Sequence, residues 1–174
     1  MRRKRAARRF KPRSIRLLLV AESPPSATDR YFYFTDVAKH DGLWAETMKH
    51  FYAEDFGPVA IERARKEEWL RKLQAQGLFL IDAVKEPIAG SHTARVRIIR
   101  SQADALVSEI GRLEPRGIVL IKSTVWEALH EIFEDEELPV LNRGPIPFPG
   151  SGQQRRFHEE LERLGVRGFI RTRR

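Results

Sequence analysis

The chain has 174 residues, of which 41% are hydrophobic and 32% are charged, so it is long enough to form one domain with a packed core. No apolar stretch approaches the roughly 20 residues that a membrane-spanning helix needs, and we expect no membrane partner. The sequence contains no cysteine, which excludes disulfides, thiol nucleophiles and cysteine-bound zinc or iron–sulfur clusters and fits a cytoplasmic location.

The formal net charge of +8 is concentrated near the beginning of the chain. Eight basic residues lie within residues 1–13, and the remaining 24 basic residues equal the 24 acidic ones in number. We expect residues 1–13 to form a disordered basic arm and residues 14–174 to form a single domain. Such an arm is either a solubilising extension or a segment that is attracted to the phosphates of a nucleic acid.

Short apolar runs separated by amphipathic segments follow the arm. The first run, at 15–20, is typical of a strand buried on both faces, and it ends before Pro24 and Pro25, where strand pairing cannot continue. Three similar runs lie at 78–81, 118–121 and 139–141. Each run is short enough for a strand and is bounded by polar or turn residues, so the sequence predicts about four buried strands.

Helical patterns lie between these runs. Helices are expected at 43–51 and 61–73, and around the apolar stripes at 106–113, 125–133 and 157–164. The last three are expected to begin with N-terminal caps at Ser101, Thr124 and Ser151. Strands that alternate with helices predict a three-layer α/β/α fold with a central parallel sheet.

In a parallel sheet, the loops that follow the strands meet at one edge, where ligand sites are usually found. We expect 21–34, 82–92, 122–124 and 142–152 to converge there. Glu22 directly follows the first strand, where it is suited to hold a water or a ligand, although a solvated turn residue is the alternative. Asp82 ends an apolar run, and a buried carboxylate requires a partner, a raised pKa or a ligand. The alternative for Asp82 is a cap on a nearby loop or helix.

The other candidate residues lie in two loops. Four consecutive aromatic residues at 31–34 either close the core or leave a ring free to stack on a base. The loop 144–152 contains three prolines and leads into a helix start, whose N–H groups suit a phosphate with help from Arg155 and Arg156. The histidines show no metal-ligand spacing, and His92 alone among them is a site candidate, so we expect no metal and no other cofactor.

Taken together, residues 15–164 resemble the uracil-DNA glycosylase superfamily. The segment Ala21-Glu22-Ser23-Pro24-Pro25 looks like that family's first motif, which is Gly-Glu-Ala-Pro-Gly in some branches. Asp82 ends the second strand, where the family often has an asparagine that reads the edge of uracil, and Phe34 lies about where the family has its base-stacking ring. The segment Pro147-Phe148-Pro149-Gly150-Ser151 looks like a drifted form of the second motif, His-Pro-Ser-Pro, whose loop enters the minor groove.

The resemblance implies a four-stranded parallel sheet between helices, and a pocket that receives a base flipped out of duplex DNA. With it, we assign catalysis to Glu22 and Asp82. Contact with the base is assigned to Ser23, Pro24, Tyr33 and Phe34. Contact with DNA is assigned to the second motif and the helix after it, at Pro147, Pro149, Gly150, Ser151, Arg155 and Arg156.

The sequence departs from the family pattern at three positions. Ile146 stands where the motif has a histidine that stabilises the departing base, and isoleucine cannot donate a hydrogen bond. Ser23 replaces the aspartate or asparagine that orients water in several branches, and an ionised Asp82 would repel the carbonyls of uracil. The branches that share the glutamate also tend to carry a cysteine-bound iron–sulfur cluster, which this chain cannot hold. We therefore expect a base with an exocyclic amine or ring N–H, such as a deaminated or alkylated purine.

The leading hypothesis is a monomeric DNA-binding protein that recognises or excises a damaged or modified base by hydrolysis of the N-glycosidic bond. The alternatives are a noncatalytic nucleic-acid-binding module and a binder or hydrolase of a small nucleotide. A DNA-binding protein predicts salt-dependent affinity that weakens when residues 1–13 are removed, whereas a small-nucleotide protein predicts thermal stabilisation by free nucleotide.

Overall fold

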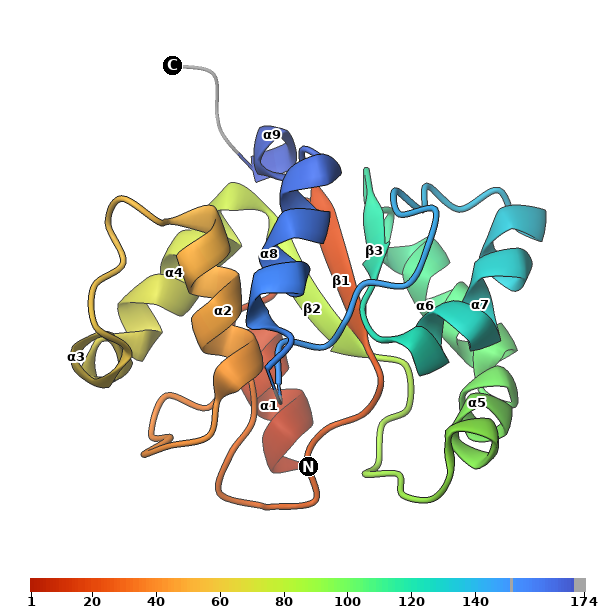
Figure 1. The fold of residues 1–174 in the computed structure, drawn as a ribbon, viewed down its shortest axis with the longest axis horizontal. Coiled ribbons are helices and arrows are strands. Elements are labelled where there is room, and N and C mark those ends of the chain that lie inside the picture. Colours follow the sequence, from red (N-terminus) through yellow and green to blue (C-terminus); the bar gives the residue numbers. More distant parts are fainter. Residues whose placement is uncertain (151, 171–174) are drawn as a thin grey trace.

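Three parallel strands form the centre of the protein. The computed structural model describes residues 1–150 and 152–170. The strands are β1 (Leu17–Ala21), β2 (Leu78–Asp82) and β3 (Ile118–Leu120), in the order β2-β1-β3 (Figure 1). Every residue of the three strands is buried, as expected for apolar runs that are covered on both faces. The register pairs Ala21 at the end of β1 with Asp82 at the end of β2, so the residues that follow these two strands start side by side.

The strand predicted at 139–141 is not a strand of this sheet. The chain after β3 makes two isolated parallel bridges instead, which join Val140 to Ile118 and Ile146 to Ile121. Prolines at 139, 145 and 147 lack the N–H group that a continuous ladder requires, which explains why pairing stops after single bridges. The prediction of about four strands was therefore wrong by one strand, and the parallel α/β class was confirmed.

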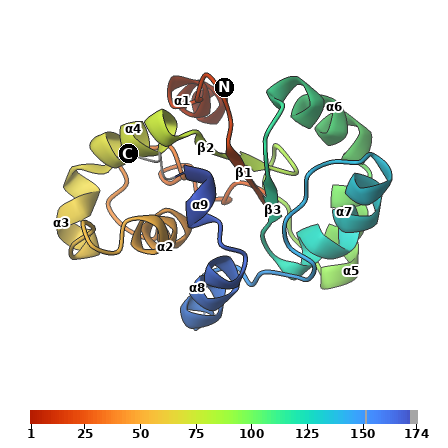
Figure 2. The same ribbon diagram turned by 90° about the horizontal axis from the view of Figure 1, so that it is seen from above.

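Helices lie on both sides of the sheet (Figure 2), with α2, α3 and α4 on one side and α5, α6 and α7 on the other. Among residues 1–150 and 152–170, no helix is both long and apolar enough to cross a membrane. The helices are α1 (Arg2–Arg9), α2 (Gly42–Phe51), α3 (Val59–Ala64), α4 (Lys66–Gln76), α5 (His92–Arg100), α6 (Ala103–Leu113), α7 (Ser123–Asp135), α8 (Gln154–Arg163) and α9 (Arg167–Ile170).

The predicted helix starts were less accurate than the helices themselves. The hydroxyl of Ser101 donates to the carbonyl of Ile98, at the end of α5, instead of capping α6. The hydroxyl of Thr124 donates to Glu22 instead of capping α7. The third predicted cap, Ser151, lies outside the described residues. Helix α5 was not predicted, although Ser91 caps it by accepting a hydrogen bond from the N–H of Ala94.

The segment predicted to be a disordered arm contains α1, so that prediction was wrong for Arg2–Arg9. Phe10, at the end of the helix, is buried in the core and stacks on Tyr33 with ring centroids 6.2 Å apart. The guanidinium of Arg3 donates to the carbonyls of Pro25 and Ala27, at 2.5 and 3.0 Å. The high charge of the segment predicted disorder, whereas the buried Phe10 anchors the helix to the domain.

We expect Gly77→Ala to lower the free energy of unfolding by about 1 to 3 kcal/mol, because an alanine is strained there. Gly77 ends α4 with φ +80°, and an added Cβ would lie 2.9 Å from the carbonyl oxygen of Ser14. Gly111→Ala in α6 is the control, since its added Cβ meets no atom within 4 Å and alanine favours helix. Urea denaturation measures both, and equal stability of the two variants would contradict the expectation.

Candidate functional site

A cavity of about 730 Å³ opens at the edge of the sheet where the strands end. All four segments that were expected to converge there contribute to its lining. They supply Glu22 after β1, Asp82 at the end of β2, Lys122 after β3, and the segment 148–150. This volume lies within the range of about 300 to 1,000 Å³ that is typical of small-molecule sites.

Glu22 is held in the cavity wall by groups from three other elements. Its exposed fraction is 9%, and its carboxylate accepts hydrogen bonds from the Nζ of Lys122 and the Oγ1 of Thr124, both at 2.5 Å. An Nη atom of Arg95 in α5 lies 3.6 Å from the same carboxylate. The backbone carbonyl of Glu22 accepts from the N–H of Val84, which ties this loop to the chain after β2. These contacts fix the carboxylate in one orientation, as a catalytic or binding group requires.

Lys122 brings a positive charge to the cavity from an unusual backbone position. Its φ of +89° and ψ of 142° lie in a region that non-glycine residues seldom adopt, and its N–H donates to the carbonyl of Ile146 at 2.7 Å. Such strain is found most often at functional sites. Its side chain is 26% exposed and contacts Glu22 at the cavity surface. Sequence reasoning placed Lys122 at this edge but gave it no role, although a lysine directly after a buried strand was a usable signal.

Asp82 supplies a second, more deeply buried carboxylate, with an exposed fraction of 7%. Burial raises its pKa from 3.8 to about 6, while the charge of Lys85 and a hydrogen bond from Tyr31 limit the rise. Burial and the nearby Asp82 in turn raise the pKa of the Tyr31 phenol above its ordinary range, so this group remains a donor. At pH 7 an aspartate with a pKa of about 6 is mainly ionised and acts as an acceptor.

The aromatic residues of the cavity are not the ones that were predicted. Tyr33 is a core residue, because its hydroxyl donates to the carbonyl of Leu80 at 2.9 Å and accepts from the N–H of Leu80 at 2.7 Å. Phe34 is buried under the guanidinium of Arg2 and lines a second cavity. The first cavity is lined instead by Tyr31, Phe32, Trp44 and Phe148, of which Phe148 is 41% exposed. The residue pattern could not show which of the four consecutive aromatic residues would form hydrogen bonds with the backbone of β2, as Tyr33 does.

The remaining predicted site residues separate into two groups. Ser23, Pro24, Pro149 and Gly150 line the cavity, whereas Ser151 lies outside the described residues. The other predicted DNA-contact residues and His92 lie elsewhere. Pro147 is half-buried beside the cavity segment, Arg155 pairs with Glu159, Arg156 bonds Gln153, and the exposed His92 pairs with Glu127.

Ile146, at the position of the family's motif histidine, is fully buried. Across the part of the chain that the structure describes, no three His, Asp or Glu side chains are grouped so that they could hold a metal ion.

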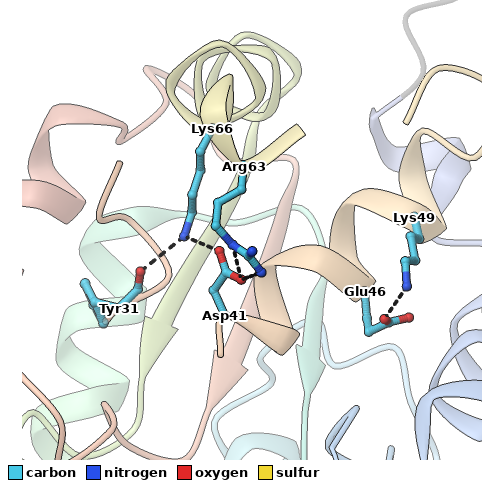
Figure 3. Close-up of polar contacts among 6 residues, drawn as sticks. All are labelled: Tyr31, Asp41, Glu46, Lys49, Arg63 and Lys66. Carbon is cyan, nitrogen blue, oxygen red and sulfur yellow. Dashed lines mark hydrogen bonds and ion pairs between the residues drawn. The ribbon is translucent and has the colours of Figure 1, made fainter. Parts of the chain in front are cut away.

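A buried ion pair holds the wall of the cavity formed by the loop before α2. Asp41 lines the cavity and accepts hydrogen bonds from Arg63 of α3, at 2.8 and 3.1 Å, and from Lys66 of α4, at 3.2 Å (Figure 3). Lys66 is 0% exposed and also donates to the carbonyl of Tyr31 at 3.4 Å. Burial lowers the pKa of Lys66 to about 8, although Asp41 opposes the shift. This cluster therefore joins the loop that carries Tyr31 and Asp41 to two helices.

A second contact positions α8, whose first residue, Gln154, lines the cavity. Glu46 of α2 pairs with Lys49 at 2.7 Å, as Figure 3 shows, and its other oxygen bonds His158 of α8, also at 2.7 Å. Helices α2 and α8 are thus linked beside the cavity.

Comparison of the chain with protein-family models, with curated proteins and with solved structures found no significant match. The fold and the cavity define the protein as a parallel α/β protein with a cavity at the carboxyl edge of its sheet.

Proposed function

We propose that the cavity binds a base flipped out of DNA, and that the protein is a uracil-DNA glycosylase-like enzyme that excises a damaged or modified base. The observation that carries the proposal is that Glu22 and Asp82 line one cavity together with aromatic rings. Proteins hold an extruded base by stacking it against aromatic side chains and by hydrogen bonds to its edge, which a carboxylate can accept.

The chemistry of Asp82 selects the kind of base. A mainly ionised carboxylate accepts hydrogen bonds, so it favours a base that presents an exocyclic amine or a ring N–H. The carbonyl oxygens of uracil would be repelled by it. Uracil has its ring N–H between two carbonyls, whereas hypoxanthine has one carbonyl beside a ring N–H and alkylated adenines have an exocyclic amine. These purines therefore match the site better than uracil, and stacking against Tyr31 or Phe148 would hold either of them.

Glu22 and Lys122 supply complementary charges for hydrolysis. The C1′–N bond breaks with its electron pair on the base, the oxygen of a water bonds to C1′, and Glu22 takes the proton that the water loses. This proton is then returned to the base, so that the products are the free base and a sugar hemiacetal. The ammonium of Lys122, 2.5 Å from Glu22, takes the place of the missing motif histidine as the hydrogen-bond donor that stabilises the departing base anion.

The experiment is a cleavage assay on labelled DNA that carries uracil, hypoxanthine, xanthine or an alkylated base, followed by alkali to break abasic sites. We expect scission at a purine substrate, and a loss of about 100-fold or more in Glu22→Gln, the range for removal of an acid–base group. Asp82→Asn replaces the acceptor carboxylate by an amide, and we expect it to lower activity on the purine substrate through weaker recognition of the base. Glu127→Gln is the matched control, because Glu127 of α7 is an exposed glutamate that pairs with His92 of α5.

A noncatalytic nucleic-acid-binding module is the second candidate, and it is favoured by the buried Ile146 at the position of the motif histidine. It predicts that no base is released from any substrate while salt-sensitive DNA binding remains. Equal activity of Asp82→Asn, Glu22→Gln and Glu127→Gln would show instead that any excision occurs at another site.

A further inference from the structure

A second cavity, of about 1,000 Å³, adjoins the first and is rich in positive charge. The two cavities share Pro24, Tyr31, Leu80 and Asp82 in their walls. Figure 1 shows α1, which forms much of the second cavity, at the same lower edge as the loops that follow β1 and β2. Three acidic residues, Asp82, Glu86 and Glu109, line it, against seven basic ones: Arg2, Arg3, Lys4, Arg8, Lys11, Lys85 and Arg112.

Helix α1 presents these charges from a fixed position. Lys4, Ala7 and Arg8 lie on one face of the helix, because they are three and four residues apart, and Lys11 follows just after its end. The helix is anchored by the buried Phe10, by Arg3, and by the amide of Gln74, which donates to the carbonyls of Arg9 and Lys11. A preformed basic wall loses little conformational entropy when it binds an anion.

Much of this positive charge is not neutralised by the protein. Arg2 pairs with Asp36, and Lys85 pairs with Glu109. Within residues 1–150 and 152–170, Lys4, Arg8, Lys11 and Arg112 have no ion-pair partner. Four unpaired cations around one large cavity suit an extended anion with several charged groups better than a single small one.

We propose that this second cavity, which we call the α1 channel, binds the sugar–phosphate backbone of the nucleic-acid strand whose base enters the first cavity. The shared wall at Tyr31 and Asp82 is where the base would leave the path of its own strand. The inference rests on the proposed function for the base, but the contacts with phosphate are independent of the base and of any chemistry.

The test measures binding of an unmodified single-stranded oligonucleotide by fluorescence anisotropy at several salt concentrations. The variant Lys4→Gln/Arg8→Gln/Lys11→Gln removes three proposed phosphate contacts, each of which contributes about 0.7 to the slope of log affinity against log salt. We expect the slope to fall by about 2, and affinity at low salt to fall by about tenfold or more. Arg112→Gln, on α6, is expected to lower the slope by about 0.7 without altering α1.

The matched control is Arg5→Gln/Arg13→Gln/Arg116→Gln, which removes the same charge from exposed positions, one of them on α1 itself. Equal losses in the two triple variants would overturn the proposal, because the attraction would then be diffuse. Thermal stabilisation by adenosine triphosphate that depends on Lys4, Arg8 and Lys11, with oligonucleotide affinity independent of length, would also overturn it in favour of a small polyphosphate.

The binding assay and the cleavage assay separate this inference from the proposed function. A reduced salt slope without release of any base would support the α1 channel and contradict base excision. Base release that requires Asp82, with an unchanged salt slope in the Lys4, Arg8 and Lys11 variant, would support base excision and overturn the channel.

Discussion

Replacement of Asp41 by asparagine is expected to lower the free energy of unfolding by about 3 to 5 kcal/mol, the usual cost of removing one partner from a buried ion pair. Lys66 is 0% exposed, and Asp41 is the carboxylate that its ammonium contacts, at 3.2 Å. An amide at this position leaves the ammonium buried without its counter-charge. Arg63 loses the same partner, so the loop before α2 loses its ion pairs with α3 and α4.

The pH dependence provides an internal check. The pKa of Lys66 is about 8 in the folded protein and near 10.5 in the unfolded chain, so the unfolded state binds more protons between these values. Stability attributable to this group therefore rises with pH across that window. Loss of Asp41 lowers the folded-state pKa further, and we expect the deficit of Asp41→Asn to be smaller at pH 9.5 than at pH 7 by urea denaturation.

Two variants complete the design. Asp55→Asn breaks the exposed pair of Asp55 with Lys72 and is expected to change stability little, because solvent screens such a pair. Asp41→Asn/Lys66→Met removes both buried charges and is expected to recover much of the loss. If Asp41→Asn cost no more than Asp55→Asn, the buried pair would have no role in holding the cavity wall.

Replacement of Asp82 by asparagine is expected to stabilise the protein at pH 8 by about 3 kcal/mol, since its pKa is raised by about two units and each unit corresponds to about 1.4 kcal/mol. The folded state holds a proton on Asp82 between pH 4 and about 6 that the unfolded chain releases. Stability attributable to this group therefore falls as pH rises through that window. An amide does not ionise, so the advantage of the variant should disappear near pH 4.

Urea denaturation of both proteins at intervals from pH 4 to pH 8 measures this difference, with Glu127→Gln as the control for an exposed carboxylate. Parallel stability curves for the wild type and Asp82→Asn would show that burial does not raise the pKa of Asp82. A variant that is more stable and yet loses base recognition would identify a carboxylate retained at the expense of stability, as functional sites often require.

Local residue patterns were sufficient for the strands and for most helices. Continuous apolar runs predicted β1, β2 and β3, because a strand covered on both faces has no polar side. The same criterion failed at 139–141, where an apolar run is present but the prolines around it prevent a ladder. Helix α1 was also not predicted, because the eight basic residues of 1–13 indicated a disordered segment. The residue that anchors this helix is the single buried Phe10.

The sequence by itself determined the parallel α/β class, the edge of the sheet where the cavity lies, and the two carboxylates in its wall, Glu22 and Asp82. These follow from chain order, because a residue directly after a buried parallel strand must lie at the carboxyl edge.

Only the tertiary structure decided which partners those carboxylates meet. Lys122, Thr124 and Arg95 come from distant parts of the chain, and each reaches Glu22 through packing that no local pattern encodes. The tertiary structure also decided that Tyr31 lines the cavity and that Tyr33 does not. It decided as well that basic side chains of α1 line the α1 channel, because the direction of a side chain depends on what its helix packs against.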